Sequence, residues 1–483
     1  MPLALLLDRR QPLHFIGVGG IGMSALAGIL AERGYNITGS DPKDHAVLDQ
    51  LRRLGVRVFR EQSAATIDAI RSGISTAPHV VISSAVPETN LELMAARRAG
   101  LAICHRSDVL AALINAQPSI AVAGSHGKTT TSSLIASLLV ATHHDPTAVI
   151  GGIVPAFGSN GRHGKGRLLV AEADESDGSL VKFHAALGVI TNVELDHTDH
   201  YPDLEALITT LQRFAGRCSQ VLANHDCPVL RERFNAQHWW SITQSEGLSF
   251  AAIASEVRGD GSTAAFFEDG TQVGTIEVPL PGLHNLSNLT AAMAACRLEG
   301  VSFAELRLAV GQLRPPGRRF DYRGSWHKRL VVDDYAHHPS EVAATMAMAR
   351  LMVTSGTSPL PTPPQRLLAV FQPHRYSRTA QFLEGFAAAL DRADAVVLAP
   401  LYSAGETPIA GINSEALAEA IRARNPDLTV SVANSPDQLT ALVAGESQPG
   451  DLVLAMGAGD INALWERLNR LEVLDTTLPL LAA

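Results

Sequence analysis

The sequence predicts an α/β protein of three domains, each built on a mostly parallel sheet with flanking helices. Short apolar runs alternate with segments of helical spacing along most of the chain, and this alternation is typical of strand–helix–strand units. The length of 483 residues accommodates about three domains of ~150 residues each. We expect Rossmann-like first and third domains and a central domain of the P-loop type.

Changes in composition place the domain boundaries. We expect a first domain at residues 1–116, a central domain at 117–314 and a third at 315–483. The Pro- and Gly-rich segment 313–317 marks the second boundary. We also expect movement between the domains when ligands bind, with hinges near 114–119 and 313–318.

Two further segments are predicted within these domains. A β-rich patch at about 247–280 is expected to form antiparallel strands, followed by a helix starting near Asn288. Residues 354–365 contain four prolines and are expected to form a surface loop.

Composition limits the kinds of partner. A formal charge of −9 and a pI near 6.0 argue against a broad nucleic-acid surface, which would be basic. The four cysteines are scattered without a CxxC pair, as in reduced cytosolic proteins. No run of 18 apolar residues is present, so we expect no membrane span. We therefore expect a cytoplasmic monomer or homodimer that binds neither nucleic acid nor membrane.

A glycine-rich loop, SIAVAGSHGKTTT over residues 119–131, carries the strongest chemical signal. An apolar run stops at Gly124, and helical spacing begins after the loop, so backbone N–H groups should face an anion at a helix N-terminus. Lys128 can reach the outer phosphates of a nucleotide, and Thr129 offers a hydroxyl to Mg²⁺. Val122 stands where the strict P-loop pattern has glycine, so this loop is a shortened variant.

Acidic residues follow the next predicted strands. Residues 172–177 read EADESD after the strand RLLVA, and residues 192–197 read NVELDH after LGVIT. Carboxylates at the carboxyl ends of parallel strands face the ligand crevice. Oxygen ligands suit Mg²⁺, while a His ligand also fits Mn²⁺. Each cluster alone could be a solvated loop, but clusters at successive strand ends favour a metal–phosphate site.

The first domain opens with a second glycine pattern, Gly17-Val18-Gly19-Gly20-Ile21-Gly22, and Asp41 follows the next strand. This pattern is typical of dinucleotide binding, with the acid on a ribose hydroxyl. The same loop could also bind the diphosphate of another nucleotide. In a third interpretation, the glycines are needed only for packing of the helix against the strand.

Polar groups also gather at later strand ends. Asn285 and Asn288 open a helix, where they are suited either to capping it or to recognising a purine edge. Arg318 and Arg319 follow the Pro-rich boundary and are placed to close onto a phosphate. Residues 333–339 and 371–378 end two strands of the third domain. Arginines there could bind the carboxylate of a small substrate through two hydrogen bonds. Each histidine alone could equally be a packing or capping residue.

Nine motifs in order resemble those of the Mur ligase family over nearly the whole chain: GVGGIGMSALA, SSAV with Asn90, GSHGKTTT, EADESDGSL, NVELDHTDHY, GLHNLSN, GRRFDY, VDDYAHHPSEV and FQPHRYSRT. Ser125 replaces the threonine usual in the family's nucleotide loop, and it keeps the hydroxyl. The resemblance implies that the first domain binds a UDP-sugar, the second binds ATP and the third brings an amino acid.

The resemblance also implies an activity: ATP-dependent joining of L-alanine to the lactyl carboxylate of UDP-N-acetylmuramate in peptidoglycan synthesis. The carboxylate would attack the γ-phosphate to give an acyl phosphate and ADP. The amine would then displace phosphate and leave UDP-N-acetylmuramoyl-L-alanine. Residues 198–217 contain no lysine, which excludes the carbamylated lysine of many relatives there and agrees with the alanine-adding branch.

Site residues follow from the same resemblance. Lys128 and Arg319 would neutralise the γ-phosphate, and His337 would lie near the incoming amine as a base or an orienting group. The implied ATP-binding residues are Gly124, Ser125, His126, Gly127, Lys128, Thr129, Thr130, His284, Asn285 and Asn288. The implied metal ligands for Mg²⁺ or Mn²⁺ are Thr129, Glu172 and His197. The implied UDP-sugar residues are Gly19, Gly20, Gly22, Asp41, Ser84, His105 and Arg106. The implied alanine pocket consists of Tyr335, His337, His374, Arg375 and Arg378.

Besides a family member that adds a different amino acid, three other functions remain open at this point. One is a related ligase that attaches a whole peptide in murein recycling. Another is an NAD-dependent oxidoreductase built on the first domain, which would leave Lys128 and Glu172 unexplained. The third is a nucleotide-dependent switch that uses the loop at 124–129.

Overall fold

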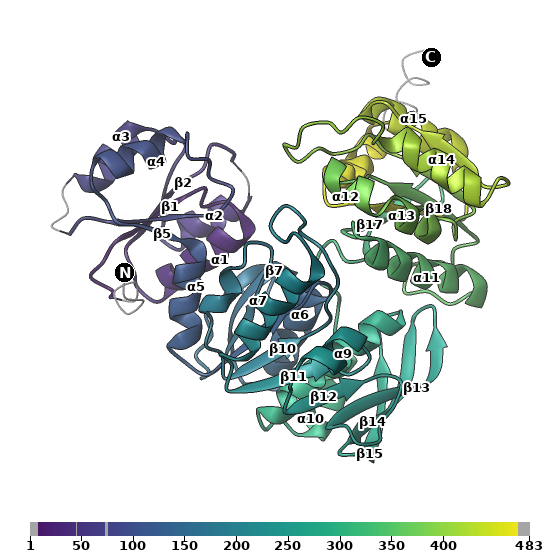
Figure 1. Ribbon diagram of the computed structural model, residues 1–483, viewed down its shortest axis with the longest axis horizontal. Coiled ribbons are helices and arrows are strands. Elements are labelled where there is room, and N and C mark those ends of the chain that lie inside the picture. Colours follow the sequence, from purple (N-terminus) through teal and green to yellow (C-terminus); the bar gives the residue numbers. More distant parts are fainter. Residues whose placement is uncertain (1–7, 45, 73–75, 472–483) are drawn as a thin grey trace, which may run out of the picture.

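The computed structural model describes residues 8–44, 46–72 and 76–471, and three β-sheets follow one another along the chain (Figure 1). The ends of the expected first and third domains, 1–7 and 472–483, lie outside the described residues. None of the described helices is both long enough and apolar enough to span a lipid bilayer.

The first sheet contains five parallel strands in the order β3-β2-β1-β4-β5. Its strands are β1 (Leu13–Ile16), β2 (Ile37–Ser40), β3 (Arg57–Phe59), β4 (His79–Ile82) and β5 (Ile103–His105). Its helices are α1 (Ile21–Glu32), α2 (Ala46–Arg53), α3 (Ala64–Arg71), α4 (Leu91–Arg98) and α5 (Arg106–Asn115). The strand order reverses between β1 and β4, and the glycine loop that follows β1 lies at this switch point, where open α/β sheets bind ligands.

The central sheet has ten strands in the order β15-β14-β13-β12-β11-β10-β6-β9-β7-β8. Its strands are β6 (Ser119–Ala123), β7 (Thr147–Val154), β8 (Ser159–Arg162), β9 (Leu169–Glu172), β10 (Leu187–Ile190), β11 (Gln220–Asn224), β12 (His238–Ser241), β13 (Phe250–Arg258), β14 (Gly261–Glu268) and β15 (Thr271–Val278). The helical segments are α6 (Lys128–Ala141), η2 (Ser179–Lys182), α7 (Leu204–Ala215), α8 (Pro228–Arg233), α9 (Leu283–Leu298) and α10 (Phe303–Val310).

Strand β6 lies between β10 and β9 and runs parallel to both. The segments that follow these three strands are the glycine loop, residues 192–197 and residues 173–177, so they meet at one edge of the sheet. The predicted antiparallel patch is confirmed, since β13, β14 and β15 form an antiparallel meander. The helix expected to start near Asn288 begins earlier, at Leu283, because Gly282 (φ 91°) turns the chain directly into it.

The third sheet has the order β16-β17-β21-β18-β19-β20 and is parallel except for β16. Its strands are β16 (Asp321–Trp326), β17 (Arg329–Asp334), β18 (Arg366–Phe371), β19 (Ala395–Leu398), β20 (Thr429–Val432) and β21 (Asp451–Met456). Its helical segments are α11 (Pro339–Ser355), α12 (Tyr376–Gln381), α13 (Leu383–Leu390), α14 (Ser414–Arg424), α15 (Pro436–Glu446) and η3 (Ile461–Ala463).

The proline-rich segment at 354–365 is more than a surface loop. It forms no strand, but Leu360 is only 8% exposed. The backbone N–H of Gly259, in the turn between β13 and β14, donates a 2.8 Å hydrogen bond to the hydroxyl of Thr357. The segment therefore packs against the central domain, a long-range contact that its composition does not reveal.

The first and central domains share one apolar core, which runs from β1 and α1 through α5 to α7. Helix α1 lies against β7 and β8. A Cβ atom on Gly161 of β8 would lie 2.7 Å from the Cα of Ala25 in α1, so only glycine allows this close approach. In Figure 1 the first domain (purple) adjoins the central one (teal), and the third (green to yellow) lies above α9 and β13.

Candidate functional site

The glycine loop after β6 has the backbone that an anion-binding turn requires. Gly124 (φ 123°) and Gly127 (φ 80°) both have left-handed backbone conformations, which favour glycine. A Cβ on Gly127 would also lie 2.6 Å from the side-chain oxygen of Asn288 on α9. Gly127 is the N-cap of α6, so the loop and the helix dipole favour a phosphate at this point.

Hydrogen bonds hold the loop to the segment after β10. The Ser125 hydroxyl donates to the Glu194 carbonyl (2.7 Å) and accepts from the Glu194 N–H (2.9 Å). The His126 N–H donates to the side-chain oxygen of Asn192 (2.9 Å). The backbone of Ser125 and His126 is thereby fixed before any ligand arrives, as preorganised phosphate binding needs.

Lys128 begins α6 and is buried. Its ammonium group donates to the Ser125 carbonyl (3.0 Å) and to the Glu175 carboxylate (2.9 Å). Burial alone would lower the pKa of Lys128, but the negative charges of Glu175 and Asp174 outweigh it and raise the pKa above its usual value. Lys128 is therefore a permanent cation at the end of the phosphate loop.

Glu172 ends β9 beside the loop. Its carboxylate accepts hydrogen bonds from the Thr129 hydroxyl (3.0 Å) and from the Gly151 N–H (2.8 Å). Burial raises the pKa of Glu172, while the nearby Lys128 opposes that shift. A hydroxyl and a carboxylate side by side at the end of a phosphate loop form a donor pair that suits a hard divalent cation.

His197 lies in a second group of possible metal ligands, with Asp174 and Glu175. Its Nε2 lies 3.6 Å from the Glu175 carboxylate. Burial lowers the pKa of His197, which favours the neutral imidazole that a metal needs. Sequence reasoning paired His197 with Glu172, whereas the structure groups it with these other two carboxylates of the same motif.

A cavity of about 860 Å³ lies between the central and third domains, beside the loop. Its central-domain wall includes His126, Gly127, Thr130, Asn224, Trp240, His284, Asn285 and Asn288. Its third-domain wall includes Arg319, Phe320, Ser340, Glu341, Ser358 and Leu360. This volume accommodates a nucleotide-sized ligand, and the predicted purine-reading residues all line it.

The two asparagines do not cap α9. The helix begins after Gly282 without a side-chain cap. The side-chain amide of Asn285 donates to the Pro281 carbonyl (2.8 Å), and the side-chain oxygen of Asn288 accepts from the Thr131 hydroxyl (3.2 Å). Burial lowers the pKa of His284 to about 4, with a smaller contribution from Arg319, so this ring is a neutral hydrogen-bonding group at physiological pH.

The third-domain residues surround the start of α11. The guanidinium of Arg319 lies over the Tyr335 ring, 5.3 Å from its centroid, and 3.9 Å from the Glu341 carboxylate. The Nδ1 of His337 lies 2.9 Å from the Tyr335 carbonyl and 3.2 Å from Glu341. His337 and Tyr335 pack edge to face. Three of the predicted residues therefore meet at one strand end.

The other predicted alanine-pocket residues follow β18. His374 stacks on Tyr402, and burial lowers its pKa to about 4. Arg378 is buried and binds Asp196 of the central domain (2.5 Å). Arg375 pairs with the exposed Asp199 (2.8 Å). In this conformation both arginines hold acidic side chains of the central domain.

In the first domain, the predicted residues cluster around the glycine loop. The Gly19 N–H donates to the Asp41 carboxylate (3.0 Å). A Cβ on Gly22 would lie 3.4 Å from the Arg106 guanidinium. Gly20 is the N-cap of α1. A loop of N–H groups with a guanidinium beside it suits a diphosphate.

Ser84 and His105 lie on the side of this loop that faces the central domain. The Ser84 hydroxyl lies 3.2 Å from the Nε2 of His105 and donates to Asp177 (3.4 Å). Arg106 lies 3.9 Å from the same Asp177 carboxylate. Asp177 belongs to the EADESD motif, so the first-domain residues reach the acidic segment of the central domain.

Comparison with known proteins decides the family. Three family models match consecutive segments: Mur ligase family, catalytic domain (residues 12–118), Mur ligase middle domain (122–296) and Mur ligase, glutamate ligase domain (318–459). The chain belongs to the Mur ligase family. The resemblance predicted from the nine motifs is confirmed.

This Mur ligase is 63% identical over 482 residues to the UDP-N-acetylmuramate–L-alanine ligase of Prochlorococcus marinus (strain MIT 9303), covering 100% of this chain and 99% of that protein. It is 63% identical over 464 residues to the protein of the same name from Synechococcus sp. (strain CC9605), covering 96% and 99%. The crystal structure of the UDP-N-acetylmuramate–alanine ligase from Thermotoga maritima aligns with a TM-score of 0.78 at 24% identity, covering 96% of this chain and 99% of that one. The predicted fold class is confirmed.

Sequence reasoning missed several acidic partners. Glu175 holds Lys128, Asp196 holds Arg378, and Glu341 lies beside both His126 (3.4 Å) and His337. Glu175 and Asp196 stand inside motifs that the sequence analysis quoted, but their partners lie far along the chain. Glu341 had a local signal, because it is the third residue of α11 and forms a capping box with the N-cap His338.

Proposed function

We propose that this Mur ligase joins L-alanine to the lactyl carboxylate of UDP-N-acetylmuramate, with hydrolysis of ATP to ADP and phosphate, in the synthesis of peptidoglycan. The observation that carries the proposal is the 63% identity, over the whole chain, to a UDP-N-acetylmuramate–L-alanine ligase. The geometry supports it, because His126 and Gly127 of the phosphate loop line a nucleotide-sized cavity, and the buried Lys128 follows them directly at the start of α6. The family assignment removes the support for an NAD-dependent oxidoreductase.

The first step is phosphoryl transfer. An oxygen of the lactyl carboxylate attacks the γ-phosphorus of ATP, the bond to the bridging oxygen breaks, and ADP leaves. Such a reaction depends mostly on positioning and on neutralising charge. We assign the ammonium group of Lys128 and the N–H groups of Gly127, Lys128 and Thr129 at the start of α6 to the phosphates. Arg319 lines the same cavity from the third domain and supplies a second positive charge.

The residues present also fit a divalent cation. Thr129 and Glu172 offer two oxygen donors at the phosphate loop, and Asp174, Glu175 and His197 form a group of ligand atoms within 4.8 Å of one another. Mg²⁺ bound there would neutralise phosphate charge. The acidity of this edge of the sheet agrees with the need for a cation, because ATP and the three carboxylates of Glu172, Asp174 and Glu175 would otherwise repel one another.

The second step forms the amide. The amine of L-alanine attacks the acyl carbon, the bond to the phosphate oxygen breaks, and phosphate leaves while the amine loses a proton. His337 is assigned to the incoming amine, because its ring lies with Tyr335 and His374 at the strand ends that face the central domain. Arg375 and Arg378 would release Asp199 and Asp196 in order to bind the alanine carboxylate.

The experiment that tests the proposal measures phosphate release with ATP, Mg²⁺ and UDP-N-acetylmuramate. Reactions with L-alanine, glycine, L-serine, the murein tripeptide and no amino acid run in parallel. We expect release to depend on both the UDP-sugar and L-alanine, together with a new amide product. Phosphate release that does not depend on the UDP-sugar would indicate a nucleotide-dependent switch. Phosphate release that requires the tripeptide would indicate a murein-recycling ligase.

A further inference from the structure

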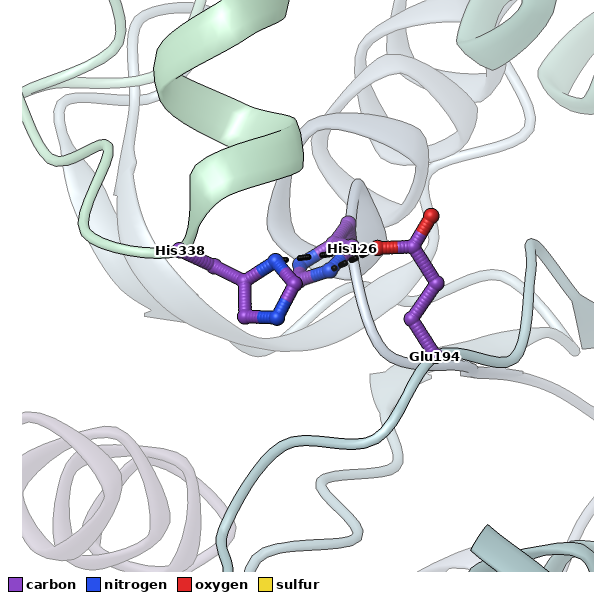
Figure 2. A group of neighbouring side chains, drawn as sticks. All are labelled: His126, Glu194 and His338. Atoms are coloured by element: carbon purple, nitrogen blue, oxygen red, sulfur yellow. Dashed lines mark hydrogen bonds and ion pairs between the residues drawn. The ribbon is translucent and has the colours of Figure 1, made fainter. Parts of the chain in front are cut away.

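Three side chains meet where the third domain contacts the nucleotide loop, and we call them the bridging cluster: His126, Glu194 and His338 (Figure 2). His126 comes from the loop after β6, Glu194 from the segment after β10, and His338 is the N-cap of α11. The Nε2 of His126 lies 3.2 Å from the Glu194 carboxylate oxygen Oε2. The Nδ1 of His338 lies 3.6 Å from the same oxygen.

These separations match those of donors around a tetrahedral metal ion. Ligands about 2.0–2.1 Å from a tetrahedral Zn²⁺ lie roughly 3.4 Å from one another. The distances from the Glu194 oxygen Oε2 to the two imidazole nitrogens, 3.2 and 3.6 Å, lie on either side of that value. Two imidazole nitrogens and a carboxylate oxygen are also the ligand set of many zinc sites, whereas Mg²⁺ prefers oxygen ligands alone.

Other residues around the cluster support this arrangement. The Glu341 carboxylate lies 3.4 Å from the Nδ1 of His126, so it orients the ring with Nε2 toward Glu194, as carboxylates do behind metal-binding histidines. The Ser340 hydroxyl donates to the Glu194 Oε2 at 2.5 Å. Two carboxylates near two imidazoles can balance the charge of a divalent ion.

We propose that the bridging cluster is a binding site for a divalent transition-metal ion such as Zn²⁺, distinct from the magnesium site at Thr129 and Glu172. The ion would be held by His126 Nε2, a Glu194 oxygen and His338 Nδ1, with water in the open position. At His338 it would displace the weak 3.4 Å hydrogen bond that Nδ1 accepts from the Ser340 N–H. His126 and Glu194 belong to the central domain and His338 to the third. The ion therefore ties the nucleotide loop to the start of α11.

The test titrates the full-length protein, freed of nucleotide and metals, with Co²⁺, which shows strong visible absorption when tetrahedral. The variant His338→Asn removes the imidazole but keeps a residue able to accept the Ser340 N–H at the helix start. Glu194→Gln removes the charge and keeps an acceptor for Ser340. We expect each variant to weaken Co²⁺ binding at least tenfold, and Zn²⁺ to displace Co²⁺ from the wild type.

The control is His143→Asn. His143 is an exposed residue after α6 with a left-handed backbone (φ 62°), a conformation that asparagine tolerates, so the tetrahedral signal should remain. His197→Asn tests the competing group with Asp174 and Glu175. If His338→Asn and Glu194→Gln bind Co²⁺ as tightly as the wild type, or if only His197→Asn abolishes the signal, the proposal is wrong.

Discussion

We expect the buried ion pair between Arg378 and Asp196 to contribute more free energy to the contact between the central and third domains than any other ion pair there. Both side chains are only 6% exposed, and the guanidinium donates twice to one carboxylate oxygen, at 2.5 and 3.1 Å. Burial alone would raise the pKa of Asp196, but Arg378 outweighs it and holds the pKa well below the usual range. The pair is therefore fully charged at neutral pH.

The burial of both side chains sets the expected coupling free energy between Arg378 and Asp196. Removing one partner of a buried pair costs about 3–5 kcal/mol when the other charge stays buried. Here the domains can separate and let water reach the remaining charge, so we expect a smaller net coupling energy of about 2 kcal/mol, within the usual range for contacting residues. A change of this size alters an equilibrium constant roughly 30-fold.

A double-mutant cycle measures this coupling. Arg378→Met, Asp196→Asn and the double variant are titrated with a non-hydrolysable ATP analogue, because its cavity is lined by both domains. Each single variant should bind the analogue more weakly by up to roughly 30-fold. The double variant should bind little worse than either single variant.

The matched control is the neighbouring ion pair of Arg375 and Asp199. Its nitrogen and oxygen atoms lie 2.8 Å apart, but the Asp199 side chain is 50% exposed. An exposed pair should couple by less than about 1 kcal/mol. If the effects of Arg378→Met and Asp196→Asn simply add, or if both pairs couple equally, the reasoning from burial is refuted.

Three further predictions concern the nucleotide site. Lys128→Ala should lower the rate of phosphate release on the order of 10²–10³-fold, as expected for a preorganised charge; near-normal turnover would contradict its assignment. Gly259→Ala should raise the KM for ATP several-fold, because the new Cβ atom would lie 2.0 Å from the Thr357 carbonyl oxygen. Gly445→Ala is the control: a Cβ atom there would have no neighbouring atom within 4 Å, so the KM for ATP should not change. Burial lowers the pKa of His284 to about 4, so its stabilising effect is complete above pH 6.5 and is lost as the pH falls toward 4; the thermal midpoint of His284→Asn should fall less over that interval than that of the wild type.

Local patterns predicted the parts of the fold that depend on neighbouring residues. The alternation of apolar runs and helices indicated parallel sheets, and the glycine loop at 124–129 indicated the turn before α6. The start of α9 was expected near Asn288 because the asparagines of GLHNLSN suit the cap of a helix. In the structure Gly282 turns the chain into α9, and the Asn285 amide binds the Pro281 carbonyl.

Long-range contacts could not be predicted in the same way. Arg378 and Asp196 are 182 residues apart, and Ser340 and Glu194 are 146 apart. Their meeting depends on how the third domain lies against the central one, and no local pattern encodes that placement. The sequence could show which residue types stand at strand ends, but not that Arg378 would face a carboxylate of another domain.

The two interdomain contacts differ in chemistry, and from this difference we infer which domain can move. The first and central domains share an apolar core, and separating them would expose it to water at a cost proportional to its area. The third domain meets the nucleotide loop mainly through charged and polar groups, including the pair of Arg378 and Asp196 and the bond from Ser340 to Glu194. Water can replace such contacts far more readily than apolar ones. Of the two hinges predicted from the sequence, the one at 313–318 is therefore better suited to movement, and the left-handed backbone of Arg318 (φ 58°) marks the place where the chain turns between the two domains.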